Sequence, residues 1–264
     1  MSTILEQIAE ATKERVAESK KNIDNAQMRR MAEGMDCNTE FPFLKALSKE
    51  GMSFICECKK ASPSKGLIAE DFPYVDIALS YEEAGASCIS VLTEPKWFLG
   101  CNEYLKEITE AVSIPCIRKD FTVDEYMIYE AKTLGASAVL LICSILSKEQ
   151  LKEYHAIADS LGLSAIVETH DEKEMEMAID ARAKIVGVNN RNLKDFSVDV
   201  GNSGRLRAMA PSGTIFVAES GIKTREDIVK LEEAHVDAVL IGETLMKAPD
   251  KKAMLDYLKG VSND

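Results

Sequence analysis

The feature of this sequence that most constrains its fold is a regular alternation of short apolar runs and helical patterns, which begins at Ser53. Eight runs are rich in residues that favour strands, and their starts lie about 20 to 34 residues apart. The runs span residues 53–59, 87–92, 114–119, 136–142, 164–168, 185–189, 214–219 and 236–241. Apolar residues at helical spacing between these runs predict helices. The helices are expected over residues 75–84, 103–112, 124–134, 148–161, 172–181, 202–209 and 225–234.

Alternation of strands and helices implies parallel strands, because a parallel connection needs a crossover segment that is usually a helix. Eight such units predict an α/β fold, the closed (β/α)₈ TIM barrel, with an active site at the carboxyl ends of its strands. An open doubly wound sheet is the alternative. No Gly-x-Gly-x-x-Gly follows the first strand, which disfavours a dinucleotide-binding version of that sheet.

The first 50 residues lack this alternation. Apolar residues at helical spacing predict helices over residues 3–22 and 27–33, and residues 41–47 form a third, short apolar segment. We expect residues 1–50 to be an N-terminal helical extension packed on a barrel of residues 51–264. The two parts are expected to form one structural domain.

Composition excludes several classes of protein. The formal net charge of −12 argues against nucleic-acid binding, which needs a basic face. No apolar run reaches the roughly 18 residues of a membrane span, and the N-terminus lacks the layout of a signal peptide. The seven cysteines lie mostly in apolar runs, which indicates reduced thiols and a cytoplasmic protein. Cys56 and Cys58 have no second pair at zinc spacing, so no metal is expected.

Charged and polar side chains gather at the predicted carboxyl ends of the strands. Glu57 and Lys59 share one face of the first strand, because alternate strand residues point the same way. Later ends supply Lys119-Asp120, Glu168, Asn189-Asn190-Arg191, Glu219-Ser220 and Gly242-Glu243. Burial of such charges costs several kcal/mol per ion, so the bias indicates a catalytic centre, although single members can be structural ion pairs or helix caps. The three histidines, His155, His170 and His235, are assigned no catalytic role.

The last two strand ends predict a phosphate site. Ser220-Gly221 and Gly242-Glu243 each place a glycine beside a helix start, where backbone N–H groups can approach an anion closely. Barrel closure would bring Lys59, from the first strand, next to the eighth strand. Ordinary turn formation is the alternative role of these glycines.

Together the motifs resemble one family, the indole-3-glycerol phosphate synthases of tryptophan biosynthesis. The resemblance covers essentially the whole chain. The motifs that carry it are residues 57–66, Glu-Cys-Lys-Lys-Ala-Ser-Pro-Ser-Lys-Gly, together with residues 90–94, 119–121, 187–193, 218–222 and 240–243. It implies a carbon–carbon lyase that decarboxylates and dehydrates 1-(2-carboxyphenylamino)-1-deoxyribulose 5-phosphate while closing the indole ring. It calls for no cofactor and no metal, and a monomer is expected, with weak association to other enzymes of the pathway.

By this resemblance, Lys119 is the general acid of ring closure and Glu168 the acid of dehydration, while Glu57 and Lys59 form a second acid–base element. Asn189 and Arg191 are expected to orient Glu57 and the sugar hydroxyls. The remaining assignments follow the same motifs. The anthranilate ring is surrounded by Phe98, Phe121, Leu140 and Leu193. A mobile loop over the site contains Ser62, Pro63 and Ser64. The phosphate is bound by Lys59 together with Ser220, Gly221, Gly242 and the backbone of Glu243, and Ser220 is also among the catalytic residues.

Two other functions fit a phosphate-binding barrel. A Schiff-base aldolase would use Lys119 or Lys59 as its nucleophile. A non-catalytic barrel would bind a phosphorylated ligand as a sensor or scaffold, and it would not need the complete set of Glu57, Lys119 and Glu168.

Overall fold

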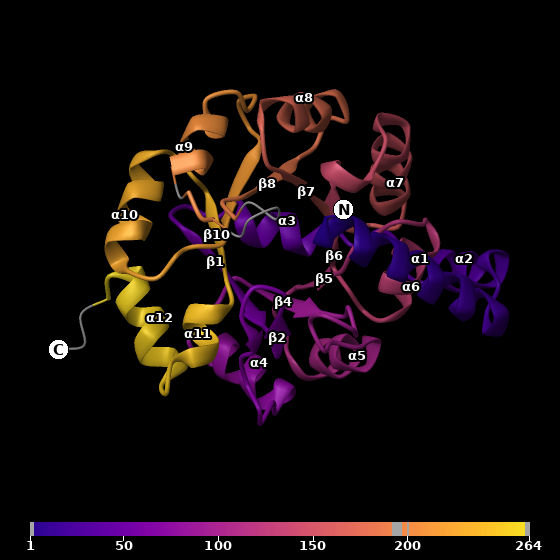
Figure 1. Ribbon diagram of the computed structural model, residues 1–264, viewed down its shortest axis with the longest axis horizontal. Helices are drawn as coiled ribbons and strands as arrows, with labels where there is room; N and C mark the ends of the chain where they lie inside the picture. Colours follow the sequence, from indigo (N-terminus) through magenta and orange to yellow (C-terminus); the bar gives the residue numbers. More distant parts are fainter. Residues whose placement is uncertain (1–2, 192–196, 200, 262–264) are drawn as a thin grey trace.

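The computed structural model describes residues 3–191, 197–199 and 201–261. Eight parallel strands close into a barrel, in which each strand pairs with the barrel strands before and after it along the chain and the last pairs with the first. Figure 1 shows helices arranged around these strands. The predicted TIM barrel is therefore confirmed.

The strands follow the predicted runs closely. They are β1 (Ser53–Cys58), β4 (Cys88–Leu92), β5 (Cys116–Lys119), β6 (Ala138–Ile142), β7 (Ser164–Thr169), β8 (Ile185–Asn189), β9 (Ile215–Glu219) and β10 (Ala238–Ile241). β5 begins two residues later than predicted because Pro115 has no N–H for the ladder, and the N–H groups of Ser113 and Ile114 donate instead to Glu82 Oε1. The loop after β1 contains a small antiparallel hairpin that was not predicted, β2 (Ala61–Ser62) and β3 (Gly66–Leu67).

The helices also lie where the pattern placed them. They are α4 (Tyr74–Glu83), α5 (Asn102–Ala111), α6 (Tyr126–Thr133), α7 (Lys148–Ser160), α8 (Glu172–Asp180), α9 (Gly201–Arg207) and α10 (Arg225–Glu233), with a 3₁₀ turn η1 (Cys143–Ile145) before α7. Two helices after the last strand were not predicted, α11 (Glu243–Lys247) and α12 (Lys251–Lys259). No helix of the described chain is long and apolar enough to cross a membrane.

Side-chain alternation divides the core into two layers. Phe54, Cys56 and Cys58 of β1 belong to the large cluster between strands and helices, whereas Ile55 belongs to the cluster inside the barrel. The same alternation directs Glu57 into the barrel, as the sequence predicted. Apolar side chains fill the described interior below this level, so the inward-facing charged groups of the described residues gather at the carboxyl ends of the strands.

The N-terminal segment forms three helices, α1 (Ile4–Asn22), α2 (Asn25–Glu33) and α3 (Pro42–Leu47). A capping box between Thr3 and Glu6 starts α1. α3 lies at the amino end of β1, where Ser53 Oγ donates to the carbonyl of Ala46. α1 begins beside η1, which follows β6, and runs outward to α2 (Figure 1), which packs on α6. The N-terminal segment thus contacts both ends of the barrel.

Candidate active site

A buried lysine bridges two carboxylates at the carboxyl ends of the strands. Lys119, the last residue of β5, places Nζ 3.2 Å from Glu168 Oε2 on β7 and 2.8 Å from Glu219 Oε2 on β9. Both glutamates are almost fully buried, and the lysine is 12% exposed. All three side chains line one cavity together with Glu57 and Asn189.

The Lys119 ammonium stays charged despite its burial. Burial opposes the charge, but Glu219, Glu168 and Glu57 outweigh it and raise the pKa of Lys119 above its ordinary value. Burial also works against a charged Glu168, yet Lys119, His170 and Asn189 hold the pKa of that carboxyl well below its usual range. A carboxylate and an ammonium therefore coexist at neutral pH.

Glu219 differs from Glu168 although both contact the same ammonium. Burial raises the pKa of Glu219 to about 7, with Lys119 opposing and the charge on Glu168 adding to the rise. Its second oxygen, Oε1, has no hydrogen-bond partner among the described residues. It faces Gly187 of β8, where a Cβ would overlap it. The pair Glu168 and Glu219 thus offers one ionised and one protonatable carboxyl on either side of Lys119.

A second ion pair lies on the β1 side of the mouth. Lys59 Nζ is 3.1 Å from Glu57 Oε2, and Ser90 Oγ donates to Glu57 Oε1 at 3.4 Å. Gly242, just after β10, allows this arrangement, because a Cβ there would overlap Glu57 Oε2 and lie 3.3 Å from Cδ of Lys59.

Basic and small residues surround a second cavity, which shares with the first Glu57, Lys59, Ser62, Ser64, Arg191, Ser220 and Leu240. Its other lining residues include Lys65, Gly221, Lys223, Gly242 and Glu243. Ser220 and Gly221 have positive φ angles of 70° and 85°, which turn the chain sharply after β9. The predicted phosphate residues therefore lie together, next to the charged cluster.

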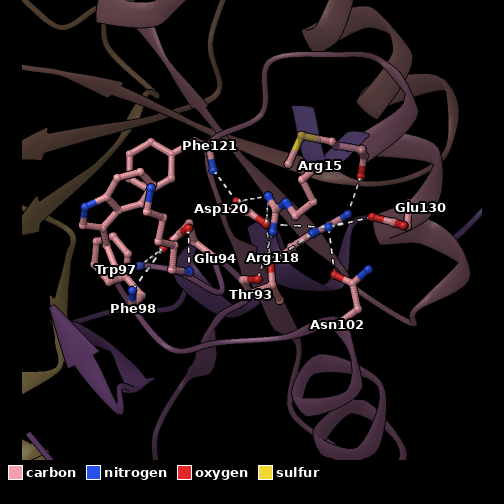
Figure 2. A network of polar contacts seen from close by, with 12 residues as sticks. Arg15, Thr93, Glu94, Trp97, Phe98, Asn102, Arg118, Asp120, Phe121 and Glu130 are labelled. Carbon is pink, nitrogen blue, oxygen red and sulfur yellow. Dashed lines mark hydrogen bonds and ion pairs between the residues drawn. The ribbon is translucent and has the colours of Figure 1, made fainter. Parts of the chain in front are cut away.

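Aromatic and aliphatic side chains form the opposite wall. Phe98 and Phe121 pack with ring centroids 5.8 Å apart, and both line the first cavity with Leu140. The Glu94 carboxylate accepts hydrogen bonds from the backbone N–H groups of Lys96, Trp97 and Phe98, which fixes the loop that carries Phe98 (Figure 2). Ile4, Leu5 and Ile8 of α1 complete this wall.

The predicted site residues of the described chain converge at the mouth of the barrel. Every one of them within the described chain lines one or both cavities; Leu193 lies outside the described residues. The expected contact of Asn189 is wrong, since its Nδ2 lies 3.3 Å from Glu168 Oε1, where it donates a hydrogen bond, and not against Glu57. The Arg191 backbone N–H donates to Asn189 Oδ1 at 3.0 Å.

Sequence reasoning missed two ionisable groups of this site. The sequence places Glu219 at a strand end without indicating a role, although this residue shares an inward face with Val217. The sequence assigns no role to His170, yet its Nε2 lies 3.3 Å from Glu168 Oε1 and its Nδ1 lies 2.9 Å from Glu174 Oε2. The position of His170, one residue beyond the carboxyl end of β7, could have indicated that it belongs to the site.

The charged groups of this site form ion pairs and have the chemistry of acids and bases. Within the described residues, no group of three or more His, Cys, Asp or Glu side chains is arranged to hold a metal ion. Lys119, Glu168 and Glu219 can exchange protons, while the second cavity can hold an anion.

Comparison with known proteins agrees with this geometry. The family model for indole-3-glycerol phosphate synthase matches residues 5–258. A relative of that name from Ruminiclostridium cellulolyticum is 55% identical over 257 residues, covering 97% of this chain and 99% of the relative. Another, from Polynucleobacter necessarius, is 42% identical and covers 98% of this chain and 99% of the relative.

Solved structures of lower identity share the fold. A 3-hexulose-6-phosphate synthase superimposes with a TM-score of 0.65 at 16% identity, covering 80% of this chain and 99% of that one. A thiamine phosphate pyrophosphorylase from Pyrococcus furiosus gives 0.60 at 15% identity, covering 80% of this chain and 94% of that one. The fold match is independent of the sequence matches, which decide the family. This chain belongs to the indole-3-glycerol phosphate synthase family.

Proposed function

We propose that the chain converts 1-(2-carboxyphenylamino)-1-deoxyribulose 5-phosphate into indole-3-glycerol phosphate, with release of carbon dioxide and water. Family membership supports the reaction, and the observation that carries the chemistry is the Lys119 ammonium held between Glu168 and Glu219. The adjoining basic cavity supports a phosphorylated substrate.

Ring closure places negative charge on the sugar ketone oxygen. The ring carbon that bears the carboxylate attacks the ketone carbon, and the carbonyl electron pair moves to oxygen. Lys119 stabilises that charge and donates its proton, which is favourable even with a raised pKa because an alkoxide is a stronger base than an amine. Cleavage of the bond to the carboxyl carbon then releases carbon dioxide and returns the electrons to the ring.

Dehydration requires an acid for the leaving hydroxyl and a base for the remaining proton. The order of the two carboxyl pKa values supports Glu219 as the acid and Glu168 as the base. This reverses the role that the sequence suggested for Glu168. Glu57 and Lys59 form the second acid–base element on the phosphate side, and Asn189 orients Glu168.

Substrate orientation follows from the two cavities. The phosphate lies against Lys59 and the backbone of Ser220, Gly221, Gly242 and Glu243, and Arg191 contacts the sugar between the cavities. The anthranilate ring packs on Phe98, Phe121 and Leu140; Leu193, which the resemblance adds to this wall, lies outside the described residues. Ser62, Pro63 and Ser64 cover the substrate from the loop after β1.

The active unit is a monomer in the cytoplasm that associates weakly with other enzymes of the pathway. All seven cysteines are free, which suits a reducing compartment. Sedimentation velocity at micromolar concentration, alone and with the pathway partners, tests the assembly state.

A Schiff-base aldolase is less compatible with the electrostatics of this site. A lysine nucleophile must be neutral to attack a carbonyl, whereas the acidic neighbours of Lys119 raise its pKa and keep it protonated. The direct test follows indole fluorescence with the carboxyphenylamino substrate and no added metal. Turnover without a borohydride-trapped lysine adduct supports the proposal; a trapped adduct favours the aldolase, and tight binding without turnover favours a non-catalytic receptor.

A further inference from the structure

The residue that follows Lys119 is held by a buried network that reaches the N-terminal helix. The Asp120 side chain is fully buried and accepts hydrogen bonds from Arg15 Nη2 at 2.8 and 2.9 Å, from Thr93 Oγ1 at 2.6 Å and from the N–H of Phe121 at 2.8 Å. Figure 2 shows Arg15, from α1, beside Arg118 and Asp120 at the end of β5. Asp120 is therefore tied to a helix about one hundred residues earlier in the chain.

Arg15 is the principal charge partner of this carboxylate. The nearest approach of Arg118 to Asp120 is 3.6 Å, and its guanidinium is committed to Glu130 at 2.7 Å, Asn102 at 2.9 Å and the carbonyl of Met127 at 3.0 Å. The two guanidiniums outweigh burial and lower the pKa of Asp120, with Arg15 contributing more. Loss of Arg15 would leave a buried carboxylate without its bidentate partner, a costly state.

The Arg15 guanidinium also reaches Lys119 by a second route, through Thr93. Arg15 Nη1 donates to the carbonyl of Thr93 at 3.1 Å, and the Thr93 N–H donates to the carbonyl of Lys119 at 3.2 Å. One side chain thus fixes the residue after Lys119 and the strand neighbour bonded to Lys119 itself.

Arg15 also sets the position of α1 over the site. Arg15 and Ile8 are seven residues apart, about two helical turns, so they share one face of α1. Ile8 and Leu5 line the cavity that contains Lys119. A single contact can therefore locate both the apolar wall from α1 and the end of β5.

We propose that Arg15 is a positioning residue for the reaction: it couples α1 to Lys119 through Asp120 and Thr93, and so aligns the ammonium with the apolar wall. Only the expected effect on kcat rests on the proposed function. The mechanical link between α1 and β5 stands on the contacts themselves.

The test compares Arg15→Ala with a matched control, Lys20→Ala. Lys20 also joins α1 to the barrel, through a 2.7 Å ion pair with Asp124, but it lies more than one turn further from the site. We expect Arg15→Ala to lower kcat by about 10- to 100-fold, as displacement of a catalytic group does, while Lys20→Ala stays within about twofold of the parent. Free guanidinium ion at millimolar concentration should restore part of the kcat of Arg15→Ala, and Arg15→Lys should lie between.

Hydrogen–deuterium exchange separates this inference from the proposed function. Backbone amides of residues 116–123 should exchange faster in Arg15→Ala than in Lys20→Ala, whether or not the parent enzyme turns over the substrate. If the parent is inactive, the proposed function fails and the exchange result still decides the link. Equal exchange in both variants, or an Arg15→Ala enzyme with parental kcat, would overturn the inference. If Arg15→Ala does not fold, Arg15→Lys is measured in the same two ways.

Discussion

Lys119 Nζ lies 2.8 Å from Oε2 of Glu219, across the barrel mouth from one strand end to another. The contact joins an ammonium whose pKa is raised to a carboxyl whose pKa is raised to about 7. A proton donor and a group that can hold or release a proton near neutral pH therefore touch before substrate arrives. This contact supports the proposal that Glu219 acts in the reaction.

Replacement of Glu219 by glutamine should lower kcat by about 10²–10⁴-fold, because the acid for the leaving hydroxyl is lost. The pH profile should change as well. Glu219 is protonated below its pKa of about 7 and ionised above it, so kcat/KM of the parent should decline as pH rises through this range. Glu219→Gln should lack this decline, whereas Glu10→Gln, at an exposed position of α1, should retain it. Two identical profiles for parent and Glu219→Gln would remove the assignment.

The glycine beside Glu219 should be intolerant of a methyl group. A Cβ at Gly187 would overlap Glu219 Oε1 and lie 2.8 Å from Cγ2 of Ile166. Gly187→Ala should therefore displace the carboxyl and lower kcat by up to about 100-fold. Gly204→Ala is the control, because its Cβ would meet Ala234 at an ordinary 3.4 Å. Steady-state kinetics of both variants test this, and a fully active Gly187→Ala enzyme would show that Glu219 needs no fixed position.

His170 should make stability depend on pH in the alkaline range. Burial works against its charge, but Glu168 and Glu174 raise the pKa of His170 to about 10, compared with roughly 6.5 in an unfolded chain. The folded state therefore binds this proton more tightly, so the stabilisation is complete below about pH 6.5 and is lost as pH rises toward 10. Urea unfolding of the parent and His170→Gln should show a difference in unfolding free energy that is largest near pH 6 and shrinks toward pH 10. A difference that is constant with pH would contradict the charged state of His170.

Much of the fold could be predicted from the sequence, because each strand and helix of a barrel produces a local pattern of apolar residues. Runs such as residues 185–189 fix a strand by composition, and alternation fixes which side chains point inward, as Ile55 and Glu57 show. Carboxyl ends of parallel strands must meet at one rim, so Glu57, Lys119 and Glu168 could be grouped without coordinates. The division into residues 1–50 and 51–264 stays a prediction.

Contacts between side chains on opposite sides of the barrel could not be predicted from the sequence in the same way. Alternation gives the direction of a side chain but not which long side chains meet over the mouth. Lys119 and Glu219 are one hundred residues apart and belong to strands that are not neighbours. The contact of Asn189 with Glu168 depends on strand stagger, and the contact of Arg15 with Asp120 depends on how α1 docks. Tertiary packing decided each of these.

Substitution of Lys119 by alanine tests the central claim most directly, with indole fluorescence recorded on the carboxyphenylamino substrate and no added metal. The account predicts ready turnover by the parent enzyme and a kcat about 10²–10⁴-fold lower for Lys119→Ala, with an unchanged circular dichroism spectrum. A folded Lys119→Ala enzyme with near-parental kcat would contradict it.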